Sequence, residues 1–171
     1  MIIANNLEKS FGPQSLFEGV SFLINEGERV GLVGKNGTGK STLFKMILGQ
    51  ESPDSGTLTT PKGYRIGTLE QIICFTQPTL LEECIKVLSP DKQWDHYKAE
   101  IILSGLGFSE QDFHKDPATF SGGYQVRINL CKALLANPNM LLLDEPTNYL
   151  DILSLRWLKE YLNKWPGEMV L

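Results

Sequence analysis

The sequence predicts an α/β fold with a mainly parallel core sheet, and three observations carry this prediction. Segments rich in glycine and β-branched residues alternate with segments of helical periodicity along the 171 residues. Residues 140–143 form a short apolar run, which is typical of a strand buried in a parallel sheet. A glycine-rich loop at 34–39 stands between a strand-like and a helix-like segment.

The first part of the chain, residues 1–71, predicts strands and turns around one helix. That helix is expected over residues 40–48, with Gly49 as its C-terminal stop. A turn at 25–28 is expected to send a strand at 29–33 back along a strand at 20–24. The predicted strands are residues 20–24, 29–33, 57–59 and 64–67.

The remaining residues predict a helical segment followed by a return to the α/β pattern. Two helices at 79–88 and 97–106 indicate a small helical subdomain over 72–120. The elements expected after it are a helix at 122–136, a strand at 140–143, a helix at 152–162 and a strand at 168–171. Because the chain ends inside this last apolar strand, we expect a truncated domain.

The glycine-rich loop predicts a phosphate-binding site. It fits the pattern G-x-x-x-x-G-K-[ST] and consists of Gly34, Lys35, Asn36, Gly37, Thr38, Gly39, Lys40 and Ser41, followed by Thr42. Glycines let backbone N–H groups close around phosphate oxygens, and the helix that follows presents its positive end to them. Lys40 is expected to reach the β- and γ-phosphates, and the Ser41 hydroxyl to bind Mg²⁺.

Two carboxylates, Asp144 and Glu145, stand where the apolar run at 140–143 ends. A strand end carrying two acidic residues is by itself compatible with simple solvation. Combined with the phosphate loop, it predicts that Asp144 lies on the metal side and that Glu145 acts as a general base toward water.

A Ser-Gly-Gly turn, residues 121–123, opens the helix expected at 122–136. Ser121 suits an N-cap, and two glycines permit close approach of a ligand to the backbone. A capping turn and a ligand-binding turn are both open on this pattern. Arg127, one turn further, is compatible with a nucleotide interface or with a surface ion pair.

The order of these motifs resembles the ATP-binding cassette (ABC) ATPases. The phosphate loop with Thr42 resembles Walker A, and residues 141–145 resemble Walker B with its catalytic Glu. Residues 69–71 are similar to the Q-loop, residues 120–125 to the signature motif, and residues 148–151 to the D-loop. The resemblance implies one nucleotide-binding domain over residues 1–171. It implies a P-loop NTPase-type core at 1–71 and 121–171 with an antiparallel β subdomain, and the helical subdomain at 72–120.

The resemblance also implies the residue roles and the cofactors, ATP and Mg²⁺. The catalytic set would be Glu145, Gln71 and Lys40, and the metal set Ser41, Gln71 and Asp144. Ser121, Gly122 and Gly123 would clamp the γ-phosphate bound to a second cassette that closes head to tail, and Asp151 would join the nucleotide contacts. Phe11 sits where the family places an aromatic ring against adenine, although ordinary core packing would also explain it.

The residues at three places resemble one branch of this family in particular, the soluble ABC-F ATPases, many of which act on ribosomes. These places are residues 10–12, 27–34 and 144–148. Tyr149 stands where ABC-F members commonly carry His, and Tyr124 where many cassettes carry Gln. The switch His of the family would follow the last strand, beyond Leu171. The isolated chain is therefore expected to be weakly active or inactive as an ATPase.

Three function hypotheses follow from this resemblance. The first is a cassette of a soluble ABC-F ATPase that couples ATP-driven closure to translation, with the ribosome as partner. The second is the cytosolic ATPase subunit of an ABC membrane transporter, partnered by a membrane subunit. The third is a non-catalytic module that holds ATP as a structural ligand.

Composition limits the remaining classes. The 16 Lys+Arg against 20 Asp+Glu argue against a strongly basic nucleic-acid binder, and no direct nucleic-acid patch is evident. Three widely spaced cysteines predict free thiols. The N-terminus lacks the basic start and long apolar stretch of a secretory signal, so a cytoplasmic location is expected.

Overall fold

In a computed structural model of the chain, the described residues are 1–69, 73–89 and 95–171. They divide into two compact units. The strand unit comprises Met1–Ile66, Asn139–Asp144 and Gly167–Leu171. The helical unit comprises Gly67–Pro138 and Glu145–Pro166.

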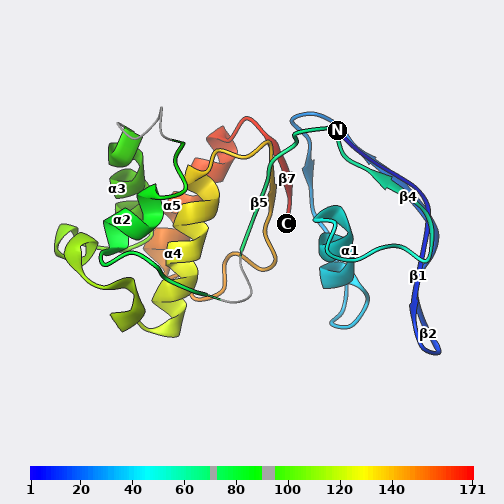
Figure 1. The fold of residues 1–171 in the computed structure, drawn as a ribbon, viewed down its shortest axis with the longest axis horizontal. Helices are drawn as coiled ribbons and strands as arrows, with labels where there is room; N and C mark the ends of the chain where they lie inside the picture. Colours follow the sequence, from blue (N-terminus) through cyan, green and yellow to red (C-terminus); the bar gives the residue numbers. More distant parts are fainter. Residues whose placement is uncertain (70–72, 90–94) are drawn as a thin grey trace. The chain divides into compact units, whose positions relative to one another are not determined.

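An antiparallel sheet forms the first layer of the strand unit (Figure 1). Its strands are β1 (Ile2–Phe11), β2 (Gln14–Ile24) and β4 (Ser55–Thr59), in the order β2-β1-β4. The register pairs Ile2 with Ile24, and Phe11 with Gln14 at the tight end of the hairpin. The expected strands at 20–24 and 57–59 therefore exist, within longer strands than the sequence predicted.

The second sheet is the mainly parallel one predicted from the sequence, in the order β3-β7-β6-β5. Its strands are β3 (Arg29–Val30), β5 (Ile66–Thr68), β6 (Met140–Leu142) and β7 (Glu168–Val170). β7 pairs in parallel with both β3 and β6.

The prediction that residues 29–33 return along 20–24 is wrong. After the turn, where the Glu28 amide donates to Asn25 O over 3.2 Å, the chain enters the other sheet and Val30 pairs with Val170. Val30 and Leu32 pack there against the apolar cluster that contains Leu142 and Val170. We attribute this pairing to burial of apolar surface, which a two-stranded hairpin at this position would not supply.

Helix α1 (Lys40–Ile47) supplies the helical part of the strand unit. It ends as predicted, with Leu48 as C-cap and Gly49 at φ 69°. Its apolar side buries Phe44, Met46 and Ile47. The main core cluster consists of Ile2, Ile24, Phe44, Ile47, Met140, Leu142 and Val170.

In its described residues the helical unit gathers four α-helices, which Figure 1 shows as one group. They are α2 (Leu80–Ile85), α3 (His96–Gly105), α4 (Gly122–Leu135) and α5 (Ile152–Lys164). Two short 3₁₀ turns, η2 (Glu110–His114) and η3 (Pro117–Thr119), lead into α4. All residues of α4 from Arg127 to Leu135 are buried, so this helix is the centre of the unit.

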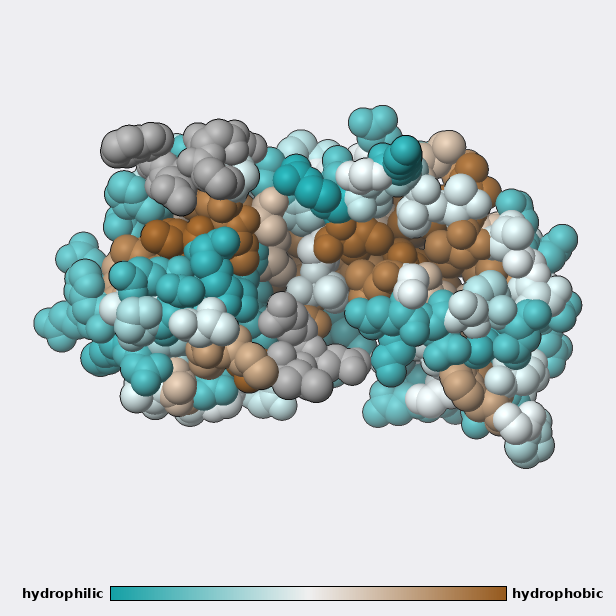
Figure 2. Space-filling model, in the orientation of Figure 1, coloured by the Kyte–Doolittle hydropathy of each residue, from teal (hydrophilic) through white to brown (hydrophobic). Residues whose placement is uncertain are grey.

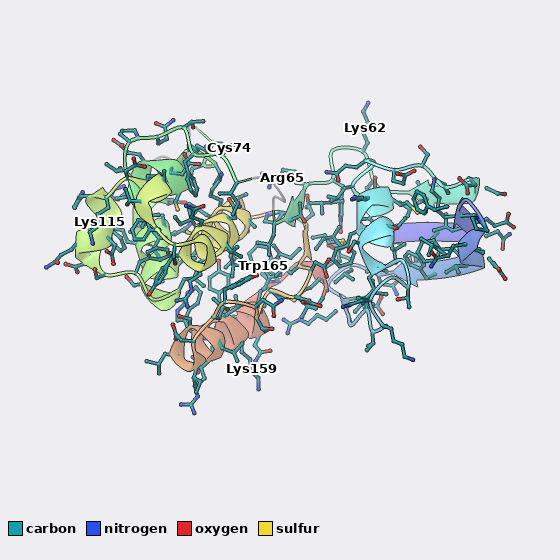
Figure 3. The ribbon with its side chains drawn as sticks, turned by 90° about the horizontal axis from the view of Figure 1, so that it is seen from below. Lys62, Arg65, Cys74, Lys115, Lys159 and Trp165 are labelled. Atoms are coloured by element: carbon teal, nitrogen blue, oxygen red, sulfur yellow. The ribbon has the colours of Figure 1, made fainter. Side chains whose placement is uncertain are left out.

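α5 is amphipathic, as its sequence predicted. Leu158 and Leu162 are buried, whereas Lys159 is exposed and extends from the helix in Figure 3. In the space-filling view, hydrophilic residues cover much of the visible surface, with hydrophobic patches between them (Figure 2). None of the helices in the described ranges is long and apolar enough to cross a membrane.

A buried charged cluster joins α2 to α4. The fully buried Glu83 carboxylate accepts from Lys132 Nζ at 3.1 Å and forms an ion pair with Lys86. It also accepts from the backbone N–H groups of Thr76 and Gln77, at 3.0 and 3.1 Å. Burial raises the pKa of Glu83, but the bonds from Lys86, the Thr76 amide and Lys132 outweigh burial and lower the pKa from 4.5 to about 2.

Candidate nucleotide site

The phosphate loop lies in the strand unit, directly before α1. Gly37 and Gly39 adopt φ values of 82° and 98°, a region that other L-residues rarely adopt. Gly39 is the N-cap of α1, and a Cβ on it would lie 2.9 Å from Phe17 Cζ. Glycine is therefore required at position 39 by both the backbone conformation and the close approach of β2.

Internal hydrogen bonds shape the loop. The Lys40 ammonium donates to Gly34 O at 2.6 Å and to Lys35 O at 3.0 Å, and Thr38 Oγ1 donates to Lys35 O at 2.9 Å. A Cβ on Gly34 would lie 2.7 Å from Thr38 Oγ1, so the loop closes tightly on itself. Asn36 and Gly37 are exposed at the tip. A glycine-rich cradle at a helix N-terminus fits the phosphates of a nucleotide.

Ser41 and Asp144 meet although they are 103 positions apart in the sequence. Ser41 Oγ donates to Asp144 Oδ2 at 3.0 Å, which joins the first turn of α1 to the end of β6. A hydroxyl and a carboxylate are oxygen donors of the kind that Mg²⁺ prefers. In the described part of the chain, three or more His, Cys, Asp or Glu side chains do not gather anywhere into a possible metal site. The Ser41 and Asp144 oxygens form a donor pair that fits Mg²⁺ bound together with phosphates.

Phe11 lies near the loop and is half exposed, at 51%. It pairs with Gln14 across the β1–β2 turn, and Gln14 Nε2 donates to Gly37 O at 3.5 Å. The Lys9 ammonium sits 5.2 Å from the centre of the Phe11 ring. The exposed ring is consistent with a stacking surface for a base, and core packing does not account for it.

Glu145 belongs to the helical unit, at the start of the segment that leads to α5. It adopts φ 47°, which is uncommon for a residue with a side chain. Asn148 holds it from both ends: Asn148 Nδ2 donates to Glu145 Oε2 at 2.7 Å, and the Asn148 amide donates to Glu145 O at 3.1 Å. Glu145 is exposed.

The Ser-Gly-Gly turn opens α4. Ser121 occupies the N-cap position as predicted, but no capping hydrogen bond to its side chain is formed within the described residues. A Cβ on Gly122 would meet no described atom within 4 Å, whereas one on Gly123 would lie 3.3 Å from Tyr149 Cβ. The exposed Ser121–Gly122 edge leaves the first backbone N–H groups of α4 open to a ligand.

Gln71 lies outside the described residues. Asp151 is the N-cap of α5, where its carboxylate accepts from the Leu153 and Ser154 amides at 3.0 and 2.9 Å and pairs with Arg127 at 3.0 Å. The Ser154 amide and the Arg127 guanidinium lower the pKa of Asp151 below its ordinary value.

Comparison with known proteins adds the family. The family model described as ABC transporter matches residues 17–148. The chain belongs to this family. As an ABC cassette it is 30% identical to the probable ATP-binding protein YheS of Escherichia coli (strain K12), over all of this chain and 32% of that protein. It is 40% identical to the energy-dependent translational throttle protein EttA of the same strain, over 95% of this chain and 30% of that protein.

Both relatives are ABC-F proteins, which confirms the predicted resemblance. The cassette spans about a third of the length of these curated relatives. A solved structure titled as the ATP binding subunit of an ABC transporter superposes with a TM-score of 0.83, at 25% identity, covering 99% of this chain and 78% of that one. The predicted α/β fold class is confirmed by this similarity.

The sequence did not identify three residues that contact the predicted site residues, and it did not predict the burial of a fourth, Arg127. Arg127 is not at a surface: it is 7% exposed and forms its ion pair from a buried position. The other three each contact one residue of the site: Lys9 contacts Phe11, Gln14 contacts Gly37, and Phe17 contacts Gly39. Their signal in the sequence is weak, because each lies on a β-strand whose pairing partners are remote in the chain.

Proposed function

We propose that this cassette binds ATP with Mg²⁺ and hydrolyses it to ADP and phosphate. The observation that carries the proposal is the 3.0 Å hydrogen bond between Ser41 Oγ and Asp144 Oδ2 beside a closed phosphate loop. It brings the end of β6 to the first turn of α1, which is the arrangement that a bound Mg²⁺–nucleotide requires. When bound, Mg²⁺ neutralises charge on the phosphates and ATP supplies the phosphoryl group.

Residues of the strand unit would bind and orient the nucleotide. The backbone of residues 34–39 and the side chains of Lys40 and Thr42 would hold the phosphates, while Phe11 would stack against adenine. Ser41 and Asp144 would ligate the cation, with Gln71 as the further ligand implied by the family resemblance. Lys40 is already directed at the loop by its bonds to Gly34 O and Lys35 O.

Residues of the helical unit would complete the reaction. Glu145 would accept the proton of the attacking water, and Asn148 would hold the Glu145 carboxylate in position. Ser121, Gly122 and Gly123 would bind the γ-phosphate held by a second cassette, because the open N-terminus of α4 favours negative charge there. Asp151 would contribute through the position of the segment that it caps. We further propose that residues 1–171 work as one nucleotide-binding domain, with 72–120 as its helical subdomain.

We propose an ABC-F role in the cytoplasm, with coupling to the ribosome. The support is the 40% identity to EttA, whose name describes a translational throttle, over 95% of this chain. An ATPase subunit of a membrane transporter is the second candidate. It is favoured by the matched family, described as ABC transporter, and by the similarity to a transporter's ATP binding subunit.

The first experiment tests nucleotide chemistry in the 171-residue chain. We expect Mg²⁺-dependent ATP binding, measured with a ribose-labelled fluorescent ATP, and slow turnover, because the γ-phosphate clamp comes from a second cassette. Glu145→Gln should retain binding and abolish the residual turnover. Failure of the wild-type chain to bind ATP, with the fold verified by circular dichroism, would overturn the proposal.

The second experiment separates the two candidate roles. It uses the natural full-length chain that carries this sequence, with Glu145→Gln and the matching change in any second cassette. Co-sedimentation with ribosomes that requires ATP at physiological salt would support the ABC-F role. Intact ATP binding without co-sedimentation would contradict it, and a pull-down from solubilised membranes would then test the transporter role.

A further inference from the structure

Arg127 holds together three backbone segments that are remote in the sequence. Its Nε and Nη2 atoms both donate to Tyr149 O, at 3.0 and 2.7 Å. Its Nη1 donates to Leu106 O at 2.9 Å and to Asp151 Oδ2 at 3.0 Å. All three guanidinium nitrogens thus donate, in four hydrogen bonds, from a residue that is 7% exposed. Such a planar, multidentate arrangement is specific to arginine, because a lysine ammonium cannot reproduce the fork.

The segment bound by Arg127 is the one that carries Glu145. Glu145 and Tyr149 adopt φ values of 47° and 67°, and both are non-glycine residues in the left-handed region. This conformation is unfavourable for a residue with a side chain and persists only where the surroundings hold it. Asn148 holds the Glu145 end, and the two bonds from Arg127 hold the Tyr149 end.

The same arginine is tied to the Ser-Gly-Gly turn. The Arg127 guanidinium lies 4.6 Å from the centre of the Tyr124 ring, and Tyr124 directly follows Gly123 on α4. Gly123 itself faces Tyr149, since a Cβ on it would lie 3.3 Å from Tyr149 Cβ. A shift of the first turn of α4 would therefore move the guanidinium and, through it, the carbonyl of Tyr149.

We propose that Arg127 is a positioning residue that makes the placement of Glu145 depend on the Ser121–Gly123 turn. This inference rests on the proposed function, in which that turn binds the partner cassette's nucleotide and Glu145 acts on the cassette's own. Engagement of one nucleotide would then stabilise the geometry needed to hydrolyse the other. All residues in the chain of contacts belong to the helical unit.

The test compares Arg127→Lys with the wild type in the natural full-length chain. The lysine retains the charge but loses the fork, so the Tyr149 carbonyl is no longer held from two sides. We expect kcat for ATP hydrolysis to fall roughly 10- to 100-fold, as misplacement of a reacting group does. The Kd for ATP should stay within about twofold, because the phosphate loop, Ser41 and Asp144 belong to the strand unit.

Lys132→Met is the matched control. Lys132 is also buried on α4, where its ammonium bonds to Glu83 of α2. We expect this variant to lower the thermal midpoint while leaving kcat per folded molecule unchanged. If Arg127→Lys reduces kcat no more than Lys132→Met does, its role is only structural and the proposal is overturned.

Hydrogen exchange, measured without nucleotide, separates this inference from the proposed function. The Leu153 and Ser154 amides are bonded to Asp151, which Arg127 holds, so Arg127→Lys should accelerate exchange across residues 145–154. Exchange at the α1 amides, in the strand unit, should stay unchanged. If the wild type binds no ATP, the proposed function fails, and hydrogen exchange alone then decides the role of Arg127. Whether or not ATP binds, unaltered exchange at residues 145–154 in Arg127→Lys would refute the positioning role.

Discussion

Replacing Glu83 by Gln should destabilise the helical unit strongly and change how its stability depends on pH. Glu83 is fully buried and faces the ammonium groups of Lys132 and Lys86. Glutamine retains an oxygen for the Thr76 and Gln77 amides but removes the negative charge. Because a buried ion pair has lost its hydration, removal of one charge typically costs about 3–5 kcal/mol.

The pKa of Glu83 gives a second, independent value for the contribution of its charge to the free energy of unfolding. It falls from an ordinary 4.5 to about 2 in the folded chain. At 1.36 kcal/mol for each pKa unit, ionised Glu83 contributes about 3 kcal/mol at neutral pH. Because the folded pKa is the lower one, this stability is fully present above pH 4.5 and is lost as the pH falls toward 2. Both routes thus predict a loss of about 3 kcal/mol for Glu83→Gln at pH 7.

Urea denaturation followed by tryptophan fluorescence is the appropriate assay. Trp157 and Trp165 belong to the helical unit, so their fluorescence reports its unfolding. Asp95→Asn is the control, because the Asp95–Lys98 pair is an exposed one and should matter little. The reasoning is refuted if Glu83→Gln matches Asp95→Asn at pH 7, or if the variant still loses stability between pH 4.5 and 2 as the wild type does.

Three further changes test the site and the core. Gly39→Ala forces a residue at φ 98° and a Cβ 2.9 Å from Phe17 Cζ, so ATP affinity should fall at least about tenfold in a fluorescent-nucleotide titration. Gly63→Ala, at φ 76° with no described atom within 4 Å of the new Cβ, should leave that affinity unchanged, and equal losses would contradict the steric argument. Ser41→Ala should remove most of the increase in ATP affinity that Mg²⁺ produces over EDTA, whereas Ser41→Thr should retain it; an undiminished Mg²⁺ effect in Ser41→Ala would exclude Ser41 as a ligand. A thiol reagent should modify the exposed Cys74 rapidly and the buried Cys84 and Cys131 only on unfolding, since burial raises the pKa of the Cys131 thiol. Rapid loss of all three thiols in the native chain would contradict the burial.

Local signals in the sequence were enough to predict most helices and several strands. Gly49 ends α1 at a positive φ, and the apolar periodicity around Leu158 and Leu162 marks α5, because both effects act within a few neighbouring residues. The strand at 29–33 shows the limit of such reasoning. Its element type was predicted, but its pairing with β7 depends on apolar burial against residues that follow it by about 140 positions, which no local rule contains.

The candidate site divides in the same way. Its chemistry was readable from the chain, since glycines, a lysine and a serine at fixed spacing fit phosphate oxygens by covalent geometry alone. The pairing of Ser41 with Asp144 was expected from the motif order and is present at 3.0 Å. The left-handed backbone of Glu145 and its bond to Asn148 had no signal in the sequence, because both depend on the path of the whole segment.

Residue types and their spacing therefore specified the family, the phosphate loop and the strand-end carboxylates, because each depends on a short stretch of chain whose geometry its own residues set. Arg127 shows what folding added. From the sequence it is compatible with a nucleotide interface, and at least as well with a surface ion pair. In the structure its side chain binds Leu106, Tyr149 and Asp151 at once. The packing of α4 against two remote segments, one at Leu106 and one at residues 149–151, buries the guanidinium, and burial of a charged group is costly unless hydrogen-bond acceptors face it.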